Sequence, residues 1–161
     1  MTSTLFKGLA YKIGYHDDVD LYLNRGDQNR PMGRYNAPGQ DAFYASESVE
    51  AAEGALRNLR PDPKRAQVLL RYDIEADTLF DVRSAPEAQQ SKFLAPWKPV
   101  VAEGQRPPNW DAADDLRARG FNGLIDQSRA NPNLFHLILF HWNAPDKPRI
   151  SLLDMPEPYQ S

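Results

Sequence analysis

The sequence predicts a single α+β domain with a small, bent, mixed β-sheet and peripheral helices. Its length of 161 residues suits one domain and allows a sizeable core. Hydrophobic residues make up 41% of the chain and charged residues 25%, which is typical of a soluble globular protein. Short strand-like segments are interspersed with few helical ones and show no clean β-α-β alternation, so a doubly wound parallel sheet is disfavoured.

The first half of the chain is expected to form two strands, a polar loop and one helix. Residues 5–15 alternate weakly and predict a strand or strand pair, and residues 17–33 predict a surface loop with at most one helical turn. A short strand over residues 41–46 precedes Ser48, which suits the N-cap of a helix over residues 49–59. The helix is expected to bury one apolar stripe, made by Ala52, Ala55, Leu56 and Leu59.

The second half is expected to hold strands, two helices and an irregular stretch. The predicted strands are residues 67–74 and 133–142, the latter being the most apolar segment and the best buried strand. Less regular patterns predict a short strand or bend at 79–82, a strand or turn at 121–126, helices at 86–94 and 111–119, and irregular chain at 96–108. Four late prolines predict a surface tail, which divides the chain into a domain over 1–143 and a tail over 144–161.

Composition excludes several classes of function. The net charge of −3 argues against direct nucleic-acid binding, because phosphate neutralisation needs a positive field. The absence of cysteine excludes disulfides, thiol chemistry and Cys-ligated zinc, and suits a reducing compartment. No apolar run has the length of a membrane span, and the N-terminus lacks the apolar core of a signal peptide. We therefore expect a cytoplasmic protein that makes no membrane contact.

Familiar catalytic motifs are missing. The sequence has no GxGxxG fingerprint, phosphate loop, HExxH or GxSxG. Its three histidines, His16, His136 and His141, lack the spacing of a metal site, so no metal is expected and a structural or surface role is favoured for them.

The most informative stretch is GRYNAPG at residues 33–39, followed by FYASES at residues 43–48. In such a turn the planar guanidinium of Arg34 can bind a phosphate or carboxylate. Tyr44, near the end of the next strand, can stack on a flat ring or donate from its hydroxyl. On residue type alone, the sequence favours a solvated arginine and a tyrosine at the edge of the core.

The order of these segments resembles the RES domain family. The GRYNAPG turn, the strand ending near Tyr44 and the helix capped by Ser48 carry the first part of the resemblance. It continues through QVLLRYDIEADTLFDV at 67–82, a mid-chain tryptophan (Trp97 or Trp110), and LRARGFNGLIDQ, Ser128 and LFHLILF between residues 116 and 140. The resemblance covers about residues 5 to 142.

This resemblance implies a bacterial toxin with an ADP-ribosyltransferase-like fold, paired with an Xre-type antitoxin that covers the active site. It also implies cleavage of the nicotinamide–ribose bond of NAD+, which is the substrate, with phosphate, water or a protein as the ribosyl acceptor. The implied catalytic positions are Arg34, Tyr44 and Ser128. The implied substrate-binding set adds Lys7, Tyr35, Asn36 and Ser46, with Lys7 at the family's N-terminal basic position.

One position departs from the family pattern. Its catalytic glutamate is expected at position 55, which is Ala55 here. Three readings remain open: a deliberate Glu→Ala change that silences a toxin, a naturally inactive relative, or use of the nearby Glu53 as a fallback acid. A non-catalytic nucleotide- or protein-binding relative is the alternative function. If the alignment holds, Ala55→Glu is expected to create or restore NAD+ cleavage.

Overall fold

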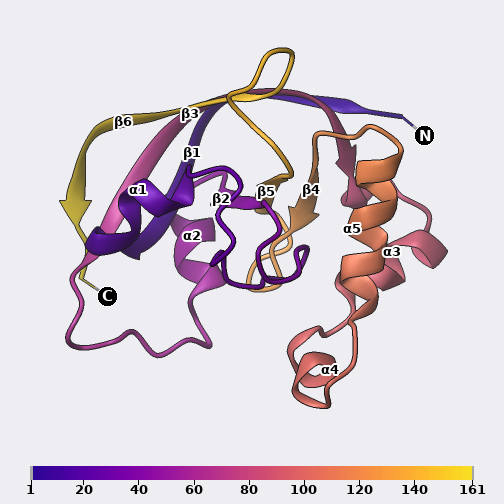
Figure 1. Cartoon of the computed structure of the whole chain (residues 1–161), viewed down its shortest axis with the longest axis horizontal. Helices are drawn as coiled ribbons and strands as arrows, with labels where there is room; N and C mark the ends of the chain where they lie inside the picture. The colour runs from indigo at the N-terminus through magenta and orange to yellow at the C-terminus, as the bar shows by residue number, and fades with distance from the viewer. Residues whose placement is uncertain (1, 161) are drawn as a thin grey trace.

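The structure, a computed structural model, describes residues 2–160 and confirms the α+β class. Its strands pair in one mixed sheet in the order β1-β2-β5-β4-β3-β6, and β1 also pairs with β3 (Figure 1). Together these pairings close a ring from β1 through β2, β5, β4 and β3 back to β1. The strands are β1 (Thr4–Tyr15), β2 (Phe43–Ser46), β3 (Gln67–Asp81), β4 (Gly123–Gln127), β5 (Phe135–Leu139) and β6 (Arg149–Pro158).

The long strand β3 gives the sheet its bend. It pairs antiparallel with β1 and β6, and its last residues, Leu79–Asp81, pair parallel with β4. Thr78, at the change of partner, has a φ of 53°, in the left-handed region. One continuous strand therefore replaces the two separate segments expected at 67–74 and 79–82. The main core lies within the ring of strands and includes Phe43, Tyr72, Ile74, Leu137, Leu139 and Trp142.

Helices cover a second core on the other face of β4 and β5. They are α3 (Glu87–Leu94) and α5 (Pro108–Ala118), which lie beside each other in Figure 1. The packed side chains include Phe80, Phe93, Leu116, Leu124 and Ile138. The irregular stretch expected at 96–108 is partly wrong, because it contains α4 (Lys98–Ala102). The remaining helical elements are α1 (Val19–Tyr22), α2 (Val49–Ala55) and the 3-10 turns η1 (His16–Asp18) and η2 (Val82–Ser84).

Helix α2 is shorter than expected. Ser48 caps it as predicted, accepting a hydrogen bond from the Ala51 N–H at 3.1 Å. After Ala55 the chain continues in i→i+3 turns, so residue 59 leaves the helical face. The expected buried stripe is therefore wrong at two places: Ala55 is exposed, and Leu59 is 49% exposed.

The C-terminal segment, for which the prolines predict a surface tail, contains the strand β6. β6 pairs antiparallel with β3 and buries Ile150, although most of its residues are exposed or half-buried. Its prolines are compatible with this position because β6 is an edge strand. The domain boundary at residue 143 stays a prediction. Within residues 2–160, no helix is long and apolar enough to cross a membrane.

Candidate functional site

A cleft of about 590 Å³ opens between α2, the β2-β5-β4 part of the sheet and the linker from α3 to α4. Arg34, Tyr44 and Ser128, far apart in the sequence, all line it, which is the convergence that the family order predicts. The other expected residues on its wall are Tyr35, Ser46 and Ala55. Their catalytic and binding roles stay predictions.

The sheet register explains how one row of polar groups reaches the cleft. Ser46 on β2 lies opposite His136 on β5, which lies opposite Asp126 on β4. The Ser46 Oγ is 2.8 Å from the Nδ1 of His136. Burial lowers the pKa of His136, so its imidazole is neutral at pH 7. Ser128 follows Asp126 by two residues and is also buried, with its Oγ accepting from the Asn131 N–H at 3.3 Å.

The hydroxyl of Tyr44 holds the turn that carries Arg34. The Tyr44 hydroxyl donates to the Asn36 Oδ1 at 2.6 Å and accepts from the Tyr35 N–H at 2.9 Å. Gly33 allows this approach, because a Cβ there would lie 2.5 Å from the Tyr44 Oη. Burial raises the pKa of Tyr44, so the hydroxyl keeps its proton. Tyr44 therefore fixes the turn, and its hydroxyl is already engaged.

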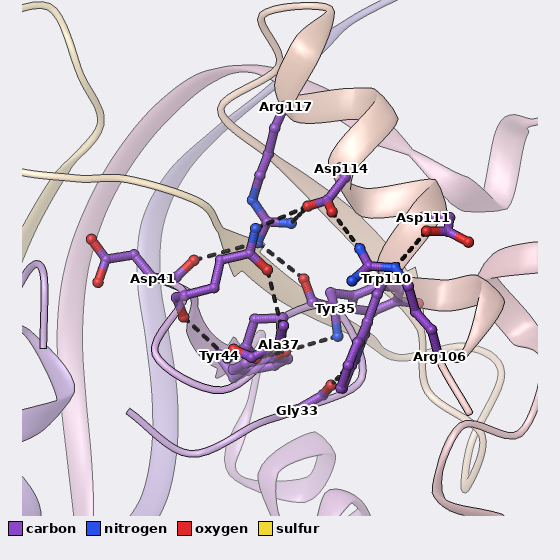
Figure 2. Close-up of polar contacts among 12 residues, drawn as sticks. Gly33, Tyr35, Ala37, Asp41, Tyr44, Arg106, Trp110, Asp111, Asp114 and Arg117 are labelled. Atoms are coloured by element: carbon purple, nitrogen blue, oxygen red, sulfur yellow. Dashed lines mark hydrogen bonds and ion pairs between the residues drawn. The ribbon is translucent and has the colours of Figure 1, made fainter. Parts of the chain in front are cut away.

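Helix α5 also holds this turn, through the side chains of Trp110 and Arg117 (Figure 2). The Trp110 indole N–H donates to the Gly33 carbonyl at 2.8 Å. The Arg117 guanidinium donates to the Tyr35 carbonyl at 3.0 Å and forms an ion pair with Asp114 at 3.0 Å. Sequence reasoning left open which tryptophan matches the family. Trp110 anchors the turn, whereas Trp97 lines the cleft.

Arg34 itself is half-buried and donates from Nη1 to the Ala95 carbonyl at 3.0 Å. Burial and the nearby Arg129 both lower the pKa of Arg34. A guanidinium retains its charge through such shifts because its ordinary pKa is so high. The cleft therefore keeps a fixed cation on this wall, in contact with the linker before α4.

Asp126 is the acidic group of the site. Its Oδ2 accepts hydrogen bonds from the Tyr35 hydroxyl at 2.6 Å and from the Arg129 Nη1 at 2.9 Å. Burial and Asp126 raise the pKa of Tyr35 well above its ordinary value, so Tyr35 is a donor here. The Asp126 Oδ1 is buried and has no hydrogen-bond partner among the described residues.

The cleft is strongly cationic although the chain carries a net charge of −3. Among the residues that the structure describes, Asp126 is the only carboxylate on the wall. Five cationic side chains line the same cleft: Lys12, Arg34, Arg57, Lys98 and Arg129. Such a concentration of one sign of charge favours an anionic ligand.

Three sequence-derived candidates lie outside this cleft. Lys7 is exposed on β1, opposite Glu75. The side chain of Asn36 is already hydrogen-bonded: its amide nitrogen donates to carbonyls in and beside its own turn, and its Oδ1 accepts from the Tyr44 hydroxyl. Glu53 is exposed and accepts from the Tyr159 hydroxyl at 2.7 Å. Its position removes the geometric support for Glu53 as a replacement acid.

Sequence reasoning gave no site role to several lining residues: Lys12, Asp126, Arg129, His136 (for which it favoured a structural or surface role) and Trp97 (which it named only as a possible match to the family's tryptophan). For Lys12 the sequence did contain a signal, because successive side chains of a strand point to opposite faces of the sheet. Lys7 and Lys12 are an odd number of residues apart on β1, so they face opposite sides of the sheet. Within residues 2–160, no group of three or more His, Asp or Glu side chains is arranged to hold a metal ion.

The chain is thus a small α+β domain with a cation-rich cleft beside the 33–39 turn. A model of the RES domain family matches residues 19–160. Since this match covers most of the chain, the protein belongs to the RES domain family.

One similar solved structure is described as the crystal structure of the MbcT–MbcA toxin–antitoxin complex of M. tuberculosis. The TM-score is 0.58 at 13% identity, and the alignment covers 95% of this chain and 86% of that chain. The similarity shows a shared fold. A comparison with curated proteins gives no match.

Proposed function

We propose that the protein is the toxin of a toxin–antitoxin pair and cleaves NAD+ at the nicotinamide–ribose bond. The observation that carries the proposal is the convergence of Arg34, Tyr35 and Ser128 on one cation-rich cleft. Family membership supports it, as does the fold shared with a protein from a toxin–antitoxin complex. NAD+ suits the cleft because its pyrophosphate is anionic and a cavity of this volume is in the usual range for such ligands.

In this proposal the residues divide the work between binding and chemistry. Arg34 and Lys12 bind the pyrophosphate, and Ser128 hydrogen-bonds to the ribose or the carboxamide. Tyr44 acts through the turn, by holding Arg34 in place. Nicotinamide leaves as a neutral molecule, so the main task is to orient the dinucleotide and stabilise a ribosyl cation.

The partner in this proposal is an Xre-type antitoxin that covers the cleft. Acidic side chains on that partner would pair with Arg34 and Lys12 and block NAD+. Contact with DNA would fall to the antitoxin, because the toxin is acidic overall. The cytoplasm, where NAD+ is abundant, is the proposed location.

A second candidate function is non-catalytic binding of a nucleotide or protein. Ala55 favours it, because the residue lies on the cleft wall but supplies no carboxylate. The binding residues would then be retained without turnover.

The deciding experiment incubates the chain with NAD+, with and without phosphate, and identifies the products by mass. Free nicotinamide with ADP-ribose indicates hydrolysis, and a phosphorylated ADP-ribose that requires added phosphate indicates phosphorolysis. ADP-ribose attached to a protein from a bacterial extract indicates transfer. Calorimetric binding of NAD+ without any product would favour the non-catalytic function. Absence of both binding and product would overturn the proposed function and the binding of NAD+ by a non-catalytic relative, and would leave protein binding as the alternative.

A further inference from the structure

Asp126 combines three properties that no other described residue of the cleft shares. It is a carboxylate, it is buried with 1% of its surface exposed, and one of its oxygens lacks a hydrogen-bond partner. Leaving a buried carboxylate oxygen unpaired is costly, so such an atom requires an explanation. A ligand in the cleft that brings a donor or a positive charge would provide one.

The other Asp126 oxygen explains how the side chain is held. Tyr35 and Arg129 both donate to Oδ2, at 2.6 and 2.9 Å, which fixes the orientation of the carboxylate. Tyr35 is adjacent to Arg34, so the Asp126 carboxylate is tied directly to the turn that carries the expected anion-binding residue. A fixed carboxylate with one oxygen left over is a preorganised electrostatic group.

We propose that Asp126 supplies the catalytic carboxylate that position 55 lacks. In this inference, which rests on the proposed function, Oδ1 accepts from a hydroxyl of the nicotinamide ribose and stabilises the ribosyl cation. The Asp126 carboxylate comes from β4, on the sheet, whereas the family glutamate would come from α2. Helix α2 and the segment that follows β4 lie close together, since a Cβ on Gly54 would lie 3.0 Å from the Cβ of Ala130.

The reaction needs no further reagent from the protein. The C1′–N1 bond breaks and its electron pair stays on the ring nitrogen, so nicotinamide departs neutral. An oxygen of water or inorganic phosphate then forms the new bond to C1′, and with water one proton goes to solvent. In this step Asp126 acts as an electrostatic group and exchanges no proton with the substrate.

The central test compares the present chain with Asp126→Asn, which retains the shape of the side chain and removes its charge. Cleavage of NAD+ should fall about 100-fold or more, which is typical for loss of one preorganised electrostatic group. The dissociation constant for NAD+ should stay within about threefold. The amide oxygen can still accept from Tyr35 and Arg129, and the amide NH2 at the Oδ1 position can donate to the ribose hydroxyl oxygen. Thermal unfolding establishes that the variant is folded.

A second carboxylate distinguishes a catalytic role from a structural one. Ala55→Glu places an acid on α2, at an exposed position of the cleft lining where it carries little desolvation cost. Added to Asp126→Asn, it should restore cleavage by about tenfold or more if the lost element is negative charge. A purely structural defect at Asp126 would not be repaired from α2.

The possible outcomes separate the role of Asp126 from the proposed function. Cleavage by Asp126→Asn equal to that of the present chain overturns the role of Asp126 and leaves the proposed function intact. NAD+ binding without cleavage by the present chain also overturns that role, and favours the non-catalytic function. Loss of NAD+ binding in Asp126→Asn, with no restoration by Ala55→Glu, makes Asp126 structural. Absence of NAD+ binding by the present chain overturns the proposed function itself.

If Asp126→Asn does not fold, Glu53→Ala tests which carboxylate supports the cleavage of NAD+. Glu53 is exposed and outside the cleft, so this change should leave the fold intact. Unchanged cleavage then supports Asp126, the one carboxylate on the cleft wall among residues 2–160. Loss of cleavage would overturn the proposal in favour of Glu53.

Discussion

The two walls of the cleft differ in how completely their polar atoms are paired. On the wall that carries Arg34, the Tyr44 hydroxyl makes two hydrogen bonds to the 33–39 turn. The side chains of Asn36 and of Trp110 on α5, which lie behind this wall and outside the cleft, are also hydrogen-bonded. On the wall formed by α2 and the end of β4, Ala55 offers no polar group and the Asp126 Oδ1 has no partner among the described residues.

This contrast separates binding from chemistry. The wall whose polar atoms are hydrogen-bonded fixes the position of Arg34, which binds an anion in the proposed function. The other wall is where the family pattern breaks, and where a carboxylate is left with an unused oxygen. Changes on the first wall should therefore affect affinity or stability, and changes on the second should affect turnover.

The largest effect on binding is expected from Arg34→Ala. Loss of a charge-assisted, bidentate contact with the pyrophosphate should weaken NAD+ binding by about 3 kcal/mol, or about 100-fold. Calorimetry measures this directly. Arg119→Ala is the matched control, because Arg119 is exposed and its ion pair with Asp115 lies outside the cleft. Equal affinity in the two variants would remove Arg34 from the site.

A smaller effect, on stability, is expected from Tyr44→Phe. The change leaves the Asn36 Oδ1 and the Tyr35 N–H without their partner, in a region from which water is largely excluded. The free energy of unfolding should fall by about 2–3 kcal/mol, measured by urea denaturation. Tyr15→Phe removes a hydroxyl contact to the exposed Asp62 N–H and should cost less than about 1 kcal/mol. Similar losses in both variants would show that the turn is not held through Tyr44.

Much of the fold could be predicted from the sequence because its signals are local. The apolar segment that contains β5, the Ser48 cap of α2 and the alternation of β1 each depend on neighbouring residues. The missed elements depend on distant ones. β6 is a strand because β3 offers it an edge, and the two parts of β3 are continuous because β1 and β4 pair with them.

The residues of the site likewise divide into those that a local motif predicts and those that depend on distant pairing. Arg34 and Tyr44 belong to one local motif, and both line the cleft. Asp126 gave no signal, because a carboxylate near a strand end is ordinary in a sequence. It reaches the cleft only through the register that places it across from His136 on β5. The exposure of Ala55 also depends on where α2 ends, which apolar periodicity predicted one turn too late.

The smallest expected effect distinguishes the two lysines of β1. Lys12 lines the cleft and donates to the Tyr44 carbonyl at 3.1 Å, whereas Lys7 is exposed elsewhere on the strand. Burial, aided by the nearby Arg30, lowers the pKa of Lys12 from its ordinary 10.5 to about 8. As the pH rises through about 8, the free cleft loses one positive charge.

NAD+ binding by the present chain should therefore weaken between pH 7 and pH 9, by about tenfold at most. Lys12→Met should weaken binding at pH 7 and remove this pH dependence, and Lys7→Met should change neither.

The free energy of unfolding of the ligand-free chain should change with pH in the opposite direction. Between about pH 8 and 10.5 the unfolded chain holds the Lys12 proton more tightly than the folded one, so the free energy of unfolding rises with pH. Calorimetry and urea denaturation across this range measure the two slopes. A slope that persists in Lys12→Met would assign the titration to another group, and an effect of Lys7→Met equal to that of Lys12→Met would return the N-terminal basic position to Lys7.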